Sequence, residues 1–130
     1  MSGPVRPQEG NVGWLDMTTD RAEEARAFYE AVVGWTSSEV EMEGYCDFAL
    51  HAPSSGRAVA GICHARGANE ALPRGVWIPY VVVRDVDRSA RRCRELGGEV
   101  VVAPAEVEGH GRFCLLRDPF GALIAVGRFG

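Results

Sequence analysis

The order of hydrophobic and polar residues along the chain repeats once. The first strand-like segment covers 12–18, and a helix then begins at Asp20, a good N-cap with Glu23 completing a capping box. Gly34 is placed to end this helix. The helix is predicted from the apolar residues that recur at helical spacing, which are Ala25, Phe28, Tyr29, Val32 and Val33.

Three strands are predicted after this helix, and a tight turn at Glu43-Gly44 joins the first two. Residues 65–75 lack periodicity and are typical of a linker. The predicted strands cover 35–42, 45–50 and 58–63. The first half is therefore strand, helix, strand, strand, strand.

The same order begins again at residue 76. Asp85 is placed to cap a second helix, which Gly97-Gly98 ends. The apolar positions of this helix are Val86, Ala90, Cys93 and Leu96. Strands are predicted over 76–83, 99–103, 112–116 and 123–127, with a loop over 104–111. Superposing the halves requires a shift of about 64 residues, which is natural for a duplicated module.

Length and composition are those of one globular domain. The 130 residues are 46% hydrophobic and 25% charged. We predict a single domain over 1–130, with module one at about 12–65, the linker at 65–75 and module two at about 76–129. Residues 1–10 read as an irregular lead without a secretion signal, and no apolar run approaches the ~20 residues of a membrane span. We therefore expect a cytoplasmic protein that binds no membrane.

Charge and cysteine usage exclude other classes. The net charge is -4, and the scattered positive charge makes nucleic acid an improbable partner. All 14 basic residues are arginine, which excludes a mechanism that uses a lysine. The four cysteines are widely spaced and are expected to be reduced thiols; they are Cys46, Cys63, Cys93 and Cys114.

Several motifs in this order resemble the vicinal-oxygen-chelate superfamily, which includes glyoxalase I, extradiol dioxygenases and bleomycin-binding resistance proteins. The motifs are Trp14-Leu15-Asp16-Met17-Thr18, Ala27-Phe28-Tyr29, Gly34-Trp35, Val59-Ala60-Gly61-Ile62, Pro79-Tyr80-Val81-Val82-Val83, Leu96-Gly97-Gly98 and Asp118-Pro119-Phe120-Gly121-Ala122. The resemblance implies an α+β fold of two βαβββ modules that form a curved mixed sheet around a cleft, often completed in a dimer.

Enzymes of this superfamily hold a divalent metal with side chains from four strands, commonly His, Glu or Gln. Carried over to this sequence, the four positions fall on Trp14, Gly61, Ile78 and Ala125. These side chains cannot ligate a metal. The resemblance therefore implies a protein without the usual metal site, and we expect no cofactor.

The first-module residues beside these positions are candidates for ligand binding. Trp14 is either core filling or an aromatic platform for a planar ligand. Asp16, two residues further along the strand, should face the same way, either solvated or as a ligand acceptor or base. Cys63 shares a strand face with Gly61 and is either an inert thiol or part of the lining.

Candidates in the second module leave similar alternatives open. Tyr80 should lie beside Ile78, as a core hydroxyl or a ligand hydrogen bond. His110, in a loop between two glycines, is the best histidine candidate or is merely exposed. Arg112 either reaches an anionic ligand or pairs with a surface acid. With Ala125, the predicted ligand-binding residues are Trp14, Asp16, Cys63, Ile78, Tyr80, His110, Arg112 and Ala125.

Three functions remain. The favoured hypothesis is a homodimeric protein that binds or sequesters a small organic molecule, such as an aromatic metabolite or antibiotic. The second is a metal-independent lyase or isomerase that uses Asp16, Tyr80 or His110 for acid–base chemistry. The third is an interaction module whose cleft is filled by its own side chains.

Overall fold

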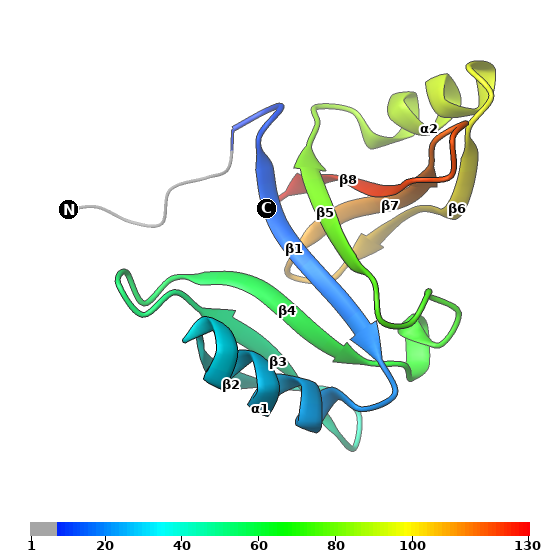
Figure 1. Ribbon diagram of the computed structural model, residues 1–130. Coiled ribbons are helices and arrows are strands. Elements are labelled where there is room, and N and C mark those ends of the chain that lie inside the picture. The colour runs from blue at the N-terminus through cyan, green and yellow to red at the C-terminus, as the bar shows by residue number, and fades with distance from the viewer. Residues whose placement is uncertain (1–7) are drawn as a thin grey trace. The chain divides into compact units, whose positions relative to one another are not determined.

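The computed structural model describes residues 8–130, so most of the predicted lead, residues 1–7, lies outside the described residues. The chain divides into two compact units (Figure 1). We call Trp14–Trp77 the first module, and Ile78–Gly130 together with residues 8–13 the second module.

The first module is a four-stranded sheet with one long helix. The strand order is β2-β3-β4-β1, with β1 parallel to β4 and the other neighbours antiparallel. The elements are β1 (Val12–Thr19), α1 (Ala22–Val33), β2 (Thr36–Glu41), β3 (Cys46–His51), β4 (Ala58–His64) and the 3-10 turn η1 (Gly67–Asn69).

The second module repeats this plan. Its strand order is β5-β8-β7-β6, with β5 parallel to β8. Its elements are β5 (Trp77–Val82), α2 (Val86–Glu95), β6 (Glu99–Val107), β7 (Gly111–Arg117) and β8 (Leu123–Phe129). Asp16 lies opposite Gly61, and Tyr80 opposite Ala125, so the two registers differ by a shift of 64 at both positions. The predicted duplication and the α+β class are confirmed.

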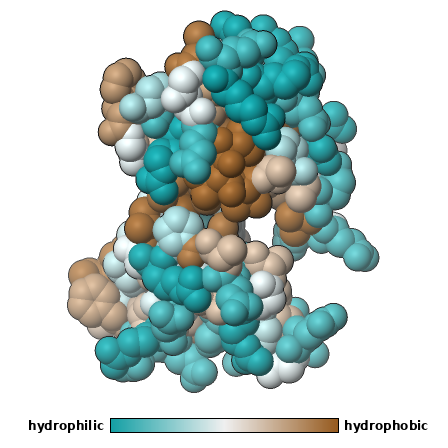
Figure 2. Space-filling view, turned by 90° about the vertical axis from the view of Figure 1, so that its right-hand side faces the viewer, coloured by the Kyte–Doolittle hydropathy of each residue, from teal (hydrophilic) through white to brown (hydrophobic). Residues whose placement is uncertain are grey.

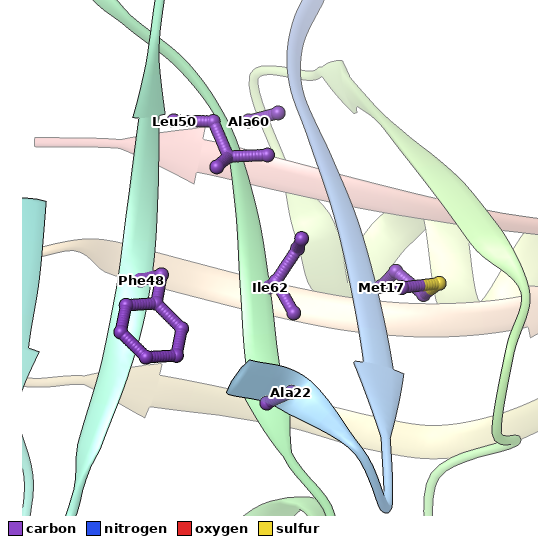
Figure 3. Close-up of a cluster of buried hydrophobic side chains, with 6 residues drawn as sticks. All are labelled: Met17, Ala22, Phe48, Leu50, Ala60 and Ile62. Atoms are coloured by element: carbon purple, nitrogen blue, oxygen red, sulfur yellow. The ribbon is translucent and has the colours of Figure 1, made fainter. Parts of the chain in front are cut away.

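The core of the first module lies between its sheet and α1. Figure 3 shows the buried side chains of β1, β3, β4 and the start of α1. They are Met17, Ala22, Phe48, Leu50, Ala60 and Ile62. Because successive side chains of a strand point to opposite faces, this core fixes which residues face away from α1.

The second module buries a separate core beneath α2. Its buried residues are Val86, Ala90, Cys114, Leu116 and Val126. Asp85 accepts a hydrogen bond from the backbone N–H of Arg88 at 3.0 Å, which confirms the predicted N-cap. Figure 2 shows hydrophobic residues gathered at the level of this module's strands, below a hydrophilic upper end.

The predicted capping box of α1 is wrong. The helix begins at Ala22, and Arg21 occupies the N-cap position without a side-chain cap. Strand β1 continues to Thr19, whose hydroxyl accepts the Arg21 backbone N–H at 3.2 Å. Asp20 is instead an acceptor for Arg74 at 3.4 Å. The C-terminal prediction is confirmed, since Gly34 has φ 86° and its N–H bonds to Glu30.

The helix predicted from periodicity is present as α1, but its apolar residues are not all buried. Phe28, Val32 and Val33 are 56%, 64% and 51% exposed. Ala25 and Tyr29, by contrast, pack against the core. The apolar residues of α1 spread over more of its circumference than the four strands can cover, so periodicity identified the helix but not its contact face.

Strand β6 extends through the first half of the predicted loop 104–111. It reaches Val107, which pairs with Gly111 of β7. Pro104 is accommodated because the register shifts between Val102 and Ala105, and such irregularities tolerate a residue without an N–H. Among the described residues, no helix has both the length and the apolar character needed to cross a membrane.

Candidate functional site

The face of the first module's sheet that points away from α1 carries the candidate residues. Leu15 and Met17 of β1, with Ala60 and Ile62 of β4, contribute to the core side. The intervening residues therefore lie on the other side. We call this surface the Trp14 face; its residues are Trp14 and Asp16 of β1 with Gly61 and Cys63 of β4.

Asp16 is the centre of the hydrogen bonds on the Trp14 face. The indole Nε1–H of Trp14 donates to Asp16 Oδ1 over 3.3 Å. The Cys63 thiol lies 3.6 Å from Oδ2 and 3.7 Å from Oδ1, within the range of a weak S–H donor. The residues predicted on these two strands are thus brought together around one half-buried carboxylate.

Gly61 makes this arrangement possible. A Cβ atom at this position would lie 2.4 Å from Asp16 Oδ1 and 3.2 Å from Cζ2 of the Trp14 ring. Any other residue at position 61 would therefore displace the carboxylate. The space above Gly61, where the superfamily resemblance places a metal ligand, is occupied by Asp16 and Trp14.

The surroundings change the protonation of Asp16. Burial raises its pKa from 3.8 to about 7, a rise that the nearby charge of Asp47 reinforces, while the hydrogen bonds from Trp14 and Cys63 lower it. Burial and the adjacent carboxylate of Asp16 also raise the pKa of the Cys63 thiol well above its ordinary value. Cys63 is therefore a neutral hydrogen-bond donor and an unreactive nucleophile.

The shifted pKa predicts how stability depends on pH. The unfolded chain releases the Asp16 proton near pH 3.8, whereas the folded protein retains it to about pH 7. The folded protein therefore binds the Asp16 proton more tightly than the unfolded chain, and this difference adds to the free energy of unfolding. The added stability is fully present below pH 3.8 and is lost as the pH rises through about 7. Asp16→Asn, which stays neutral, should be more stable than the wild type at pH 8 by roughly 1–2 kcal/mol, with less difference at pH 5.

Urea unfolding at the two pH values measures this difference. Glu43→Gln, which removes one carboxylate from the exposed β2–β3 turn, is the matched control and should follow the wild type. If the free energy of unfolding depended on pH in the same way for the wild type and for Asp16→Asn, the raised pKa of Asp16 would be contradicted.

Asp47 and His64 form a second polar pair in this module. Asp47 is 4% exposed and accepts the backbone N–H of His64 at 2.8 Å. It lies 3.2 Å from His64 Nδ1, and the His64 ring packs edge-on against Tyr45. Sequence reasoning missed this pair; a lone acid inside an otherwise apolar strand was the available signal.

The second-module candidates lie on an apolar surface. Tyr80 is opposite Ala125 in the parallel pairing, and Ile78 is buried. Phe113 of β7, which sequence reasoning did not select, packs edge-on against Tyr80 with ring centroids 5.7 Å apart. A Cβ at Gly127 would lie 2.4 Å from the Phe113 ring, so this glycine makes room for the aromatic side chain.

Arg112 and His110 do not join Tyr80. Arg112 donates to both carboxylate oxygens of Asp87 in α2, at 2.9 and 2.8 Å. Of the two alternatives for Arg112, the structure therefore shows the pairing with a surface acid. By strand alternation Arg112 faces away from Phe113, on the α2 side. His110 is exposed in the β6–β7 turn, and its backbone N–H bonds to Val107.

Two shallow hollows lie at the starts of the helices rather than on the Trp14 face. One, of about 340 Å³, is lined by Arg112 and Asp87 among others. The second, of about 290 Å³, includes Arg21 and Glu24. In both, these arginines are already ion-paired with the named acids. Neither hollow therefore presents these cations to a ligand.

The residues at the four superfamily positions do not fit a metal. Trp14 uses its only polar atom as a donor, Gly61 has no side chain, and Ile78 and Ala125 are hydrocarbon. Asp16 is accompanied by a thiol that stays protonated rather than by further ligands. Across residues 8–130, no three His, Cys, Asp or Glu side chains group closely enough to hold a metal ion.

Two βαβββ modules with matching registers define a duplicated α+β protein of the glyoxalase type. Residues 11–126 match the model of the Glyoxalase/Bleomycin resistance protein/Dioxygenase superfamily. The chain belongs to this superfamily, as the sequence motifs indicated.

Similar proteins include "Putative glyoxylase CFP32" of Mycobacterium tuberculosis, 34% identical over 92% of this chain and 44% of the relative. "Anthracycline biosynthesis protein DnrV" of Streptomyces peucetius is 28% identical over 93% of this chain and 48% of its own length. The chain therefore spans about half the length of the curated relatives that it matches.

Solved structures share the fold. A Streptomyces coelicolor methylmalonyl-CoA epimerase variant in complex with 2-nitronate-propionyl-CoA has a TM-score of 0.62, covering 95% of this chain and 96% of the epimerase. A Bacillus halodurans hypothetical protein has a TM-score of 0.63 over 95% of this chain and 96% of that protein. Identities of 16% and 9% limit these matches to the fold.

Proposed function

We propose that this protein binds a small planar organic molecule on the Trp14 face, without a metal. The observation that supports the proposal is the close packing of Trp14 and Asp16 over Gly61. This arrangement offers a rigid aromatic ring beside a single polar group, and such a combination is typical of small-molecule sites.

A thermal-shift screen tests this proposal. The screen should contain aromatic metabolites and antibiotics, an anthracycline because of the name of one relative, and methylmalonyl-CoA because of the structural neighbours. A ligand that binds the native state raises the melting temperature with its concentration. Stabilisation by a planar compound that is lost in Trp14→Ala is the expected result. Stabilisation that persists in Trp14→Ala would contradict the proposed location.

Metal removal should change neither stability nor ligand binding. Because the side chains at positions 14, 61, 78 and 125 do not fit a metal, dialysis against EDTA is expected to leave the melting temperature and ligand affinity unchanged. Metal analysis of the dialysed, untagged protein is the accompanying measurement. A stoichiometric divalent metal that restores lost binding would overturn this prediction.

Metal-independent proton transfer is a second candidate function. Asp16 favours it, because its pKa of about 7 is suited to a general base at neutral pH. A ligand from the screen that carries an acidic C–H should then exchange this hydrogen with deuterated solvent. NMR measures the exchange, and its absence in wild-type protein with bound ligand favours binding alone.

We expect the protein to form a homodimer. Strands β2 and β6 each pair on one side only within their module, and exposed strand edges favour association. The relatives are about twice as long, so a second copy would supply an equivalent length of chain. Light scattering at micromolar concentration should give about twice 14.1 kDa. A monomer over the whole accessible range would refute the dimer.

A further inference from the structure

We propose that the ligand of the Trp14 face is a planar organic cation, whose positive edge is bound by the Asp16 carboxylate. This inference rests on the proposed function and specifies the class of ligand. Within the first module, Asp16 has neutral hydrogen-bond donors as partners and is not in an ion pair with an arginine, and the inference follows from this difference.

The donors that reach Asp16 in this module are both neutral. They are the indole N–H of Trp14 and the protonated thiol of Cys63. The ion pairs within the module join other residues, namely Arg21–Glu24, Arg26–Glu30 and Arg74–Asp20, and the His64 ring contacts Asp47 rather than Asp16. Ionising a half-buried carboxylate that has no cation beside it costs desolvation free energy. A ligand that places a positive charge next to the carboxylate offsets this cost.

The neighbouring charges favour the same sign of ligand. The charge of Asp47 on β3 acts on Asp16 and adds to the negative potential there. Cys63 on β4 remains neutral, and His64 at the end of β4 is held by Asp47. A ligand with a carboxylate or phosphate at this edge would be repelled, whereas a cation would be attracted.

Trp14 supplies the planar selectivity. Its Nε1–H points to the Asp16 carboxylate, so the indole ring lies directly beside the charged group. A flat conjugated cation that contacts the ring would gain both stacking and cation–π attraction. Gly61 allows the carboxylate and the ring to pack together, because a Cβ atom at this position would lie 2.4 Å from Asp16 Oδ1 and 3.2 Å from the Trp14 ring.

Three probes with one shape and different charge test the inference. They are 2-naphthamidine, a cation; 2-naphthamide, which is neutral; and 2-naphthoate, an anion. Calorimetry at pH 8 should find the amidine about tenfold tighter than the amide, and the anion weakest. At pH 6 the amidine advantage should shrink about tenfold, because Asp16 is then mostly protonated and must release a proton.

Two variants complete the test. Asp16→Asn should remove the preference for the amidine, so that the amidine and the amide bind with affinities within about threefold of each other. Glu43→Gln, which removes an exposed acid from the β2–β3 turn, should keep the preference. If Asp16→Asn does not fold, calorimetry of the wild type in buffers of different ionisation enthalpy still decides, because amidine binding at pH 6 should release about one proton.

The outcomes separate this inference from the proposed function. Equal affinity for the amide and the amidine in wild type and Asp16→Asn overturns the cation inference and leaves planar-molecule binding in place. Tightest binding of the naphthoate also overturns it. If no probe binds up to millimolar concentration, the cation inference is rejected, and the broader screen with Trp14→Ala then decides the proposed function independently.

Discussion

Replacing Trp14 by alanine should weaken the binding of a planar ligand by about 1–3 kcal/mol, comparable to the loss of an aromatic stacking partner. Trp14 is half-buried and lies on the sheet face that points away from α1. It does not belong to the core cluster between the sheet and α1. The folding free energy should therefore fall by less than the ~3–5 kcal/mol typical of an aromatic core truncation. Calorimetry and urea unfolding of the same variant measure both quantities.

Trp14→Phe is the matched control for this experiment. It keeps a ring but removes the indole N–H that bonds to Asp16, so stacking should survive while the hydrogen bond is lost. The control is also needed for fluorescence, because Trp35 and Trp77 pack with Tyr29 and contribute their own signal. Unchanged ligand affinity in Trp14→Ala, with a large loss of stability, would assign Trp14 to the core.

Leu50→Ala should destabilise the protein by roughly 2–5 kcal/mol, the range for a fully buried leucine that leaves a cavity. Leu50 has no exposed surface and lies among Phe48, Ala60 and Ile62 (Figure 3). Urea unfolding measures the change. Ligand affinity at a temperature where the variant is folded should be unaffected, since Leu50 points to the α1 side of the sheet.

Val32→Ala is the control for Leu50→Ala. Both changes shorten an aliphatic residue, but Val32 is 64% exposed on α1, so its replacement should alter stability by no more than about 0.5 kcal/mol. Equal destabilisation by the two variants would show that Val32 is buried in the folded protein. A small effect of Leu50→Ala would contradict the assigned core.

The superfamily and the order of elements could be predicted from local signals. Gly34 and Asp85 marked a helix end and a helix start, and Gly44, with φ 82°, occupies the predicted hairpin turn. The facing of Trp14 and Asp16 towards one side also follows from strand alternation. The shift of 64 that aligned the halves recurs in the register of Asp16 with Gly61 and of Tyr80 with Ala125.

Contacts between distant residues could not be predicted in the same way. The burial of Asp47 depends on its bonds to His64, 17 positions further along the chain, and the pairing of Arg112 depends on Asp87 of α2. The start of α1 was misplaced because Asp20, a good cap by residue type, is an acceptor for Arg74 instead. Each outcome depends on which partner the fold brings near.

The sequence by itself determined the duplicated strand–helix–strand order and the residue types at the four superfamily positions, because both depend on periodicity and spacing along the chain. The tertiary structure alone decided which side of α1 is buried and what surrounds Asp16. Burial raises the Asp16 pKa to about 7, and burial results from packing between strands rather than from the identity of an aspartate. The same carboxylate in an unfolded chain would be an ordinary acid.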